Sequence, residues 1–226
     1  MRRLYPSAAD VEPEDAYAYP PGQRWLRANM VSTVDGAAAG GDGLSGSVSG
    51  EADKRVFGVL RRLADVVLVG AGTARAEGYR PARLPIAVVT GRLDLDLSTP
   101  LFTEAEHRTI VLTCEAAPEV QRQAAARVAD VVICGGSRVD VGIAVDALHE
   151  RGFSRLLCEG GPTLLRQLVA AGLLDEVCLT VSPYLAGGGA GRILGGQPLD
   201  APAQTTLTQL LEEDGWLFSR YAVQRS

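Results

Sequence analysis

Histidine is scarce in this 226-residue chain, and its cysteines are not clustered. The two histidines are His107 and His149, and the four cysteines are widely spaced with no Cys-x-x-Cys pair. A Ser-His-Asp triad and a Cys/His zinc site each need several such residues brought together, so the sequence offers adequate material for neither. Each cysteine lies in or at the end of an apolar run. We therefore interpret the cysteines as buried side chains and expect no metal site.

Positive charge and long apolar runs are also lacking. The net charge is −5, which argues against a nucleic acid or an anionic membrane as the main partner, because both require clustered cations. No apolar run approaches the length that spans a bilayer. Residues 1–21 are polar, contain prolines and lack the apolar centre of a signal peptide. We expect a cytoplasmic protein.

Short apolar runs alternate with amphipathic segments along most of the chain. This alternation predicts an α/β fold with a mainly parallel sheet and right-handed crossovers. Residues 205–212 and 216–223 flank Asp214-Gly215, a turn signal, and predict an antiparallel C-terminal hairpin. Residues 1–23 contain four prolines and are expected to form an extended arm. No linker divides the remainder, so residues 24–226 are expected to form one domain. The other predicted strands are 25–34, 65–69, 86–89, 109–113, 130–134, 155–158 and 176–182, and the predicted helices are 51–63, 119–128, 141–151 and one that begins at Pro162.

Glycine turns follow several of these strands. Because glycine lets a ligand approach unshielded backbone N–H groups, turns of this kind at the start of a helix can bind anions. The alternative is that the glycines serve only the geometry of the turn. Together the turns predict a dinucleotide site along the carboxyl edge of the sheet. The residues concerned are Gly70, Gly72, Thr73, Arg75, Thr90, Gly91, Arg92, Gly160, Gly161, Pro162 and Thr163.

A complete Rossmann fingerprint is absent. Arg75 occupies the position of its third glycine, and no acid follows the strand at 86–89 to hold a ribose 2′-hydroxyl. Thr90 and Arg92 follow that strand instead. A hydroxyl group together with a cation favours binding of a ribose 2′-phosphate. The sequence therefore predicts NADPH rather than NADH. Arg92 is the first candidate for the 2′-phosphate and Arg75 the second.

Three motifs occur in order: Asn29-Met-Val-Ser-Thr-Val-Asp-Gly36, Val69-Gly-Ala-Gly-Thr-Ala-Arg-Ala-Glu77 and Glu159-Gly-Gly-Pro162. From about Trp25 onward, the chain resembles the RibD C-terminal, or bacterial pyrimidine reductase, family. The resemblance implies a dihydrofolate-reductase-like fold, NADPH as cofactor and a homodimer. It also implies reduction of a ribosylamino-pyrimidine 5′-phosphate in riboflavin biosynthesis, of the 5-amino-6-(5-phosphoribosylamino)uracil reductase type. Substrate-binding positions that it implies are Asn29, Ser32 and Asp35.

Two departures from the family pattern affect the expected reaction. The deaminase half is missing, since no H-x-E occurs with P-C-x-x-C, so we expect reduction only. Glu77 leads into Gly-Tyr-Arg80-Pro rather than the more frequent Pro-x-Leu-Thr-x-Arg. Arg80 or Arg83 would then supply the cation that holds the substrate phosphate.

Reduction of an imine-like sugar also needs a proton, and Glu77 or Glu159 is the candidate donor. A carboxyl enclosed by apolar strands would have a raised pKa. Alternatively, Glu159 only orients backbone or ribose groups. Two other functions stay open. One is reduction of dihydrofolate or another pterin, with Glu51 or Asp53 as the ring-binding acid, and the other is a non-catalytic nucleotide-binding dimer.

Overall fold

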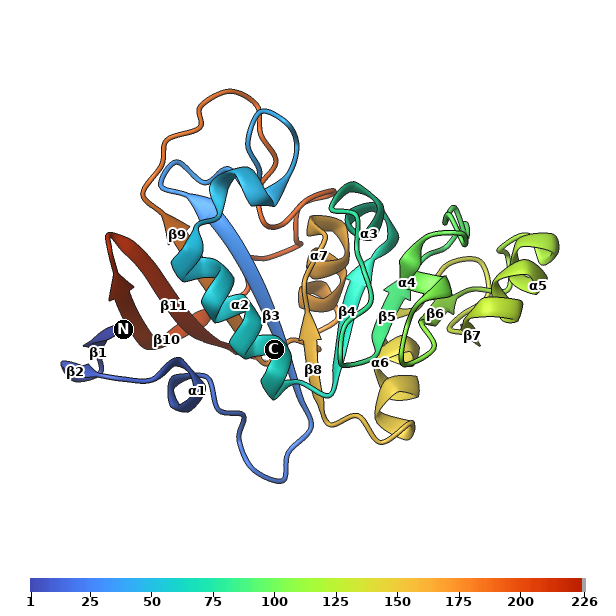
Figure 1. Ribbon diagram of the computed structural model, residues 1–226, viewed down its shortest axis with the longest axis horizontal. Coiled ribbons are helices and arrows are strands. Elements are labelled where there is room, and N and C mark those ends of the chain that lie inside the picture. Colours follow the sequence, from blue (N-terminus) through green and yellow to red (C-terminus); the bar gives the residue numbers. More distant parts are fainter. Residues whose placement is uncertain (225–226) are drawn as a thin grey trace.

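The computed structural model describes residues 1–224, which build one eleven-stranded sheet (Figure 1). The strand order is β2-β1-β10-β11-β9-β3-β8-β4-β5-β6-β7. All neighbours from β9 to β7 are parallel, as the βαβ alternation predicted. These strands are β3 (Trp25–Thr33), β4 (Val66–Gly70), β5 (Ile86–Val89), β6 (Ile110–Thr113), β7 (Asp130–Ile133), β8 (Arg155–Cys158) and β9 (Glu176–Ser182).

The remaining strands are antiparallel. β10 (Thr205–Glu213) and β11 (Trp216–Val223) form the predicted hairpin, and β11 pairs with β9. Asp214 and Gly215 connect the two strands with φ of 52° and 81°, so both turn residues are left-handed. This backbone matches the twist of a two-residue hairpin loop, which explains the Asp-Gly pair. The expected α/β fold is confirmed.

Residues 1–23 lie against the antiparallel edge. β1 (Arg2–Tyr5) pairs with β10 and with the short β2 (Ala9–Asp10), and α1 (Pro13–Ala16) follows. The buried Arg27 side chain donates to the carbonyl of Tyr17 at 2.7 Å and forms an ion pair of the same length with Glu176. Arg220 also pairs with Glu176, at 2.9 Å. A buried charge is tolerated only when it is paired in this way, so the cluster fixes the arm to the sheet.

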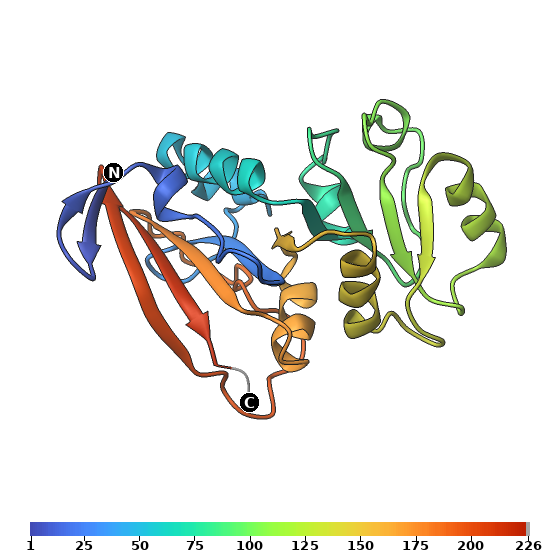
Figure 2. The same cartoon turned by 90° about the horizontal axis from the view of Figure 1, so that it is seen from below.

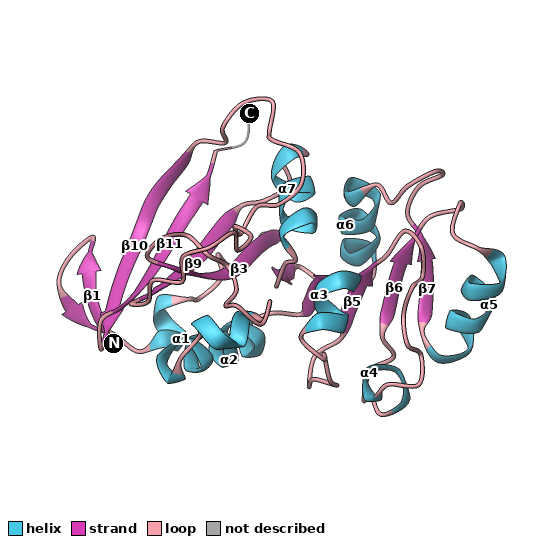
Figure 3. Ribbon diagram, turned by 90° about the horizontal axis from the view of Figure 1, so that it is seen from above, coloured by secondary structure: helices cyan, strands magenta, loops and turns pink. Residues whose placement is uncertain are grey.

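Helices cover both faces of the sheet (Figures 2 and 3). One face packs against α2 (Glu51–Leu63), α3 (Ala71–Ala76), α4 (Pro100–Thr103) and α5 (Glu119–Val128). The other face packs against α6 (Val141–Glu150) and α7 (Pro162–Ala170). Within residues 1–224, no helix is long and apolar enough to cross a membrane.

The central strands are apolar on both sides because both sides are covered. Val67, Val69 and Leu157 belong to the core beneath α2, whereas Leu68 and Leu156 belong to the core beneath α6 and α7. All five are at most 1% exposed. Burial of each such side chain contributes about 1.5–3 kcal/mol, so these strands form a rigid floor for the loops at their carboxyl ends.

Two glycine-rich segments contain regular structure. The glycine turn at residues 70–73 is the start of α3, which begins directly after β4. The loop at residues 37–50 holds a short 3-10 helix, η1 (Ser45–Val48), in which Val48 is only 3% exposed. Glycine disfavours helix in isolation, so packing against the sheet decides both conformations.

Candidate active site

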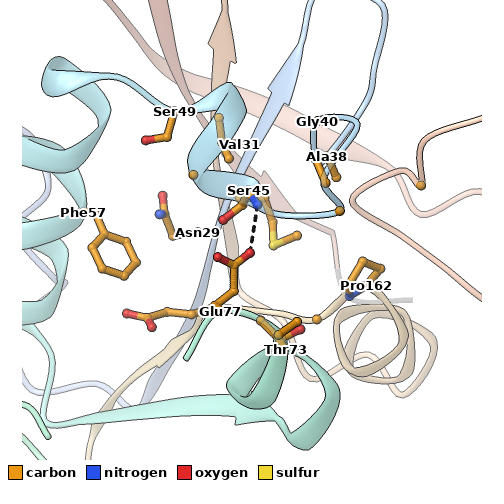
Figure 4. A pocket seen from close by; sticks show the side chains of 18 of the residues that line it. Asn29, Val31, Ala38, Gly40, Ser45, Ser49, Phe57, Thr73, Glu77 and Pro162 are labelled. Atoms are coloured by element: carbon orange, nitrogen blue, oxygen red, sulfur yellow. Dashed lines mark hydrogen bonds between the residues drawn. The ribbon is translucent and has the colours of Figure 1, made fainter. Parts of the chain in front are cut away.

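A cavity of about 740 Å³ opens at the carboxyl ends of β3, β4 and β8. Its walls are the glycine-rich loop after β3, the side of α2, the start of α3, the turn after β8 and residues 190–192. Open α/β sheets bind ligands at this edge. Figure 4 shows Asn29, Ser49 and Phe57 on one side of the space and Thr73 and Pro162 on another.

Helix α2 lines the cavity with side chains four residues apart. Asp53, Phe57 and Arg61 recur at i, i+4 and i+8, which places them on one face of the helix. Asp53 lies near the helix start, only 7% exposed, and accepts a hydrogen bond from Ser49 Oγ at 2.5 Å. Burial raises the pKa of the Asp53 carboxyl, and hydrogen bonds from Ser49 and Thr180 offset part of this effect.

Arg61 reaches across the cavity floor to Glu159. Its Nε and Nη2 donate to the two oxygens of Glu159, each at 2.7 Å, and Tyr79 donates its hydroxyl to the same carboxylate at 2.6 Å. The guanidinium also lies 4.4 Å from the ring centre of Phe57. Burial and the Glu159 carboxylate raise the pKa of the Tyr79 hydroxyl, which therefore stays protonated as a donor. The surroundings of Glu159 are thus polar rather than the apolar walls expected from its flanking strands.

Glu77 lies at the end of α3, opposite α2. One of its oxygens accepts the backbone N–H of Ser45 at 2.8 Å, the bond drawn in Figure 4. This contact joins α3 to η1 in the glycine-rich loop. Glu77 is half-buried and has no side-chain partner among the described residues, which distinguishes it from Glu159.

The two glycine turns expected to bind a dinucleotide lie side by side. Gly70 N–H donates to the carbonyl of Gly160 at 2.9 Å, so the turns after β4 and β8 are held together. A Cβ on Gly161 would stand 2.2 Å from Thr73 Oγ1, and Gly72 faces open space. The turns therefore form a cradle of glycines and backbone N–H groups at the starts of α3 and α7. This arrangement fits the pyrophosphate of a dinucleotide.

The residues expected near a 2′-phosphate surround the loop after β5. Thr90 is buried and accepts the N–H of Leu93 at 3.0 Å, so its hydroxyl shapes this loop. Arg75 pairs with Asp94 at 3.4 Å. Arg92 is exposed. Arg92 forms no ion pair among the described residues, whereas Arg75 already has a carboxylate partner.

Asp35 organises a loop rather than lining the cavity. Its carboxylate accepts the hydroxyl of Thr33 and the backbone N–H groups of Ala186 and Gly187, at 3.1 and 2.7 Å for the latter two. These bonds, with that of the Thr33 hydroxyl the strongest, lower the pKa of Asp35 to about 2. They join the end of β3 to the loop that carries Arg192.

The structure brings some of the sequence-predicted residues into the cavity and leaves others outside its lining. Those that line it are Asn29, Gly72, Thr73, Glu77, Arg80, Glu159, Gly161 and Pro162. Those outside its lining are Ser32, Asp35, Gly70, Arg75, Arg83, Thr90, Gly91, Arg92, Gly160 and Thr163. Residues not foreseen as parts of the site include Ser49, Lys54, Phe57, Arg61, Tyr79 and Arg192.

Two kinds of residue were missed for different reasons. The four-residue spacing of Phe57 and Arg61 after Asp53 was visible in the sequence and would have pointed to a shared face. Arg192 comes from a glycine-rich loop without periodicity, so no local signal marks it.

Comparison with known proteins shows the family of the chain. The model of the RibD C-terminal domain matches residues 24–214. The chain belongs to the RibD C-terminal domain family. A member from Methanothermobacter thermautotrophicus, a 2,5-diamino-6-ribosylamino-4(3H)-pyrimidinone 5′-phosphate reductase, is 32% identical over 192 residues, covering 80% of this chain and 88% of the relative.

Solved structures show the same relationship. A pyrimidine reductase-like protein from Corynebacterium diphtheriae superposes with a TM-score of 0.84 at 27% identity, covering 96% of this chain and all of the other. Dihydrofolate reductase from Enterococcus faecalis superposes with a TM-score of 0.51 at 13% identity, covering 89% of this chain and 98% of the other. The second match concerns the fold alone and confirms the expected dihydrofolate-reductase-like architecture.

Proposed function

We propose that this RibD C-terminal domain protein uses NADPH to reduce a ribosylamino-pyrimidine 5′-phosphate. The observation that carries the proposal is the cavity itself, which has a glycine cradle on one wall and the Asp53, Phe57 and Arg61 face of α2 on another. The first wall suits a pyrophosphate, and the second suits a planar, polar ring. NADPH would supply a hydride.

The chain's own groups supply the proton and the position of the substrate. Hydride addition to the carbon of an imine-like sugar leaves a nitrogen that must gain a proton. Glu77 is the better donor because Ser45 N–H engages only one of its oxygens. Glu159 instead holds Arg61 and Tyr79 in place beneath the ring.

Arg80 and Arg192 are the proposed holders of the 5′-phosphate. Both line the cavity and both are exposed, so their guanidinium groups can reach a phosphate at its mouth. Arg83 does not line the cavity. We therefore prefer Arg80 over Arg83 as a residue that binds the 5′-phosphate. Arg192 is added to the phosphate-binding residues expected from the sequence.

The test is to mix the purified protein with NADPH and each candidate substrate and to follow the loss of reduced-nicotinamide absorbance. The candidates are the 2,5-diamino-6-ribosylamino-4(3H)-pyrimidinone 5′-phosphate named for the relative and 5-amino-6-(5-phosphoribosylamino)uracil, and at least one of the two should be turned over. Dihydrofolate is included because Asp53, an acid on the helix after the glycine-rich loop, faces the cavity as the pterin alternative requires. NADPH binding without oxidation of NADPH by any substrate would support the non-catalytic alternative.

We further propose a homodimer. On the face away from α2, the antiparallel strands expose Leu217 (37% exposed) beside the partly exposed Leu179, Val181 and Tyr221. A contiguous apolar patch of this kind is a typical subunit interface. Light scattering should give twice the chain mass, and Leu217→Arg should lower it.

We also propose a domain division and a cellular location for the protein. Residues 24–224 form one domain with residues 1–23 as an arm on the same sheet, and residues 225 and 226 of the expected domain lie outside the described residues. The protein is cytoplasmic, a proposal supported by four buried cysteines that are all free thiols.

A further inference from the structure

The loop between β9 and β10 (residues 183–204) brings Arg192 to the cavity. No helix or strand forms in residues 183–204, and six of the residues from 187 to 196 are glycines. Glycine has more backbone freedom than any other residue, so a segment of this composition does not by itself keep a side chain in one place. Arg192 must therefore be held by the contacts that the loop makes with other elements.

The first half of the loop is tied to the end of β3 and to the glycine-rich segment after it. Asp35 accepts the N–H of Gly187 at 2.7 Å, and the N–H of Ala38 donates to the carbonyl of Gly191 at 2.8 Å. Gly191 directly precedes Arg192 in the chain. These bonds fix the loop on one side of Arg192 only.

The second half of the loop is tied to α7. Arg166, one turn into the helix, donates through Nε to the carbonyl of Gln197 and through Nη2 to the carbonyl of Pro198, the latter at 3.2 Å. The N–H of Gly195 donates to the carbonyl of Pro162 at 3.2 Å. A Cβ on Gly195 would stand only 2.9 Å from Pro162 Cβ, so the loop lies directly on the start of α7.

We propose that Arg166 is a positioning residue, which holds the loop so that the guanidinium of Arg192 meets the 5′-phosphate of the substrate. This inference rests on the proposed function and deepens it. Arg166 lies outside the lining of the cavity, so it acts through the loop rather than by touching the substrate. Two hydrogen bonds from its planar fork order the loop before the substrate binds, and less entropy is then lost when Arg192 engages the phosphate.

The test compares two ligands that differ only in the phosphate. Calorimetry measures the affinity for 2,5-diamino-6-ribosylamino-4(3H)-pyrimidinone 5′-phosphate and for the same compound without its phosphate. The ratio of these two affinities, the phosphate preference, does not depend on the fraction of protein that is folded, because both are measured on one preparation. The wild type is compared with Arg166→Ala, Arg192→Ala and the double variant.

The wild type should show a phosphate preference of about 100-fold, since Arg80 and Arg192 each contribute about tenfold. Arg192→Ala should lower the preference by about tenfold, and Arg166→Ala by about threefold or more. The double variant should lower it no further than Arg192→Ala does, because Arg166 acts only through Arg192. Effects of two residues that act independently would instead multiply.

Two further variants separate the position of the loop from the charge of Arg166. Gly195→Ala leaves every charge in place, but its Cβ displaces the loop from Pro162, so it should lower the phosphate preference as Arg166→Ala does. Arg108 also donates to two backbone carbonyls, but it precedes β6 and so lies toward the amino ends of the strands, away from the cavity. Arg108→Ala should leave the preference unchanged.

Several results would overturn the role of Arg166. One is an unchanged phosphate preference in Arg166→Ala, and another is a double variant in which the two losses multiply. A loss in Arg166→Ala that Gly195→Ala does not reproduce would be an effect of charge alone. Equal binding of the two compounds by the wild type, or binding of neither, would leave Arg166 no phosphate contact to position.

The proposed function fails separately. If the phosphate preference depends on Arg166 as expected but NADPH is not oxidised, the positioning role stands and the reductase activity does not. If NADPH is oxidised and the phosphate preference is the same in Arg166→Ala as in the wild type, the activity stands and the role of Arg166 is refuted.

Discussion

Arg61 holds both carboxylate oxygens of Glu159, although 98 residues separate them in the chain. The pair joins the last turn of α2 to the carboxyl end of β8, across the floor of the cavity. It also fixes the Glu159 carboxylate, which accepts a hydrogen bond from the Tyr79 hydroxyl. Glu159 is buried, so the pair is maintained in a place where either charge alone would be unfavourable.

Replacing Arg61 by leucine should lower the free energy of unfolding by about 2–4 kcal/mol, because the buried Glu159 carboxylate loses its cation. Urea denaturation at neutral pH measures the change. Arg62→Leu is the control, since Arg62 is exposed and its partner Glu14 is also on the surface. The control should change stability by less than about 1 kcal/mol. Equal losses in the two variants would contradict this account.

Glu77 and Glu159 should respond differently to conversion to glutamine. Glu77→Gln should lower kcat by about 100-fold or more and leave NADPH affinity unchanged, because the proton donor is lost and the cradle is untouched. Glu159→Gln should lower stability as well, since Arg61 loses its counter-charge. Single-turnover kinetics measures the reduction step, and fluorescence titration measures the affinity for NADPH. Together they distinguish a loss of turnover from a loss of cofactor binding in each variant. Full activity in Glu77→Gln would remove it from the proton-transfer step.

Arg92→Ala should weaken NADPH binding by about tenfold while sparing NADH, because a charge-assisted bond to the 2′-phosphate is lost. Arg75→Ala is the comparison, since its guanidinium already pairs with Asp94. Affinities for both cofactors are measured by fluorescence titration. If Arg75→Ala changes the ratio of NADPH affinity to NADH affinity and Arg92→Ala does not, Arg75 rather than Arg92 binds the 2′-phosphate.

Acid should release the loop that Asp35 holds. The pKa of Asp35 is lowered from 3.8 to about 2, so its contribution is complete above about pH 4 and is lost as pH falls toward 2. The backbone N–H groups of Ala186 and Gly187 should then lose hydrogen-exchange protection in that window. In Asp35→Asn they should be less protected at all pH values. Protection that persists at pH 2 in the wild type would contradict the assignment.

The sequence predicted those parts of the fold that depend on local pattern. The apolar run at residues 65–69 indicated a strand, and Asp214-Gly215 indicated the hairpin. Both are present. Helix α3 was missed because Gly72 disfavours helix locally, while its packing on the sheet is a tertiary effect.

The candidate site also contains residues that a local sequence pattern predicted and residues that it did not. Glycines at strand ends could be found because a backbone turn leaves a local signature, and Gly161 and Gly72 do line the cavity. The partner of Glu159 could not be found, because nothing near residue 159 in sequence indicates Arg61. The surroundings of that carboxyl were therefore expected to be apolar and are polar.

The arm described above also bears on the order in which the chain folds. β1 pairs with β10, so Arg2 and its partner Glu212 are separated by 210 residues. During synthesis, the first strand must wait for almost the whole chain to emerge before its place in the sheet exists. The parallel strands can assemble earlier, around nearer neighbours. Docking of the arm is then the closing step of folding, and it seals the sheet edge that the C-terminal hairpin would otherwise leave open to other chains.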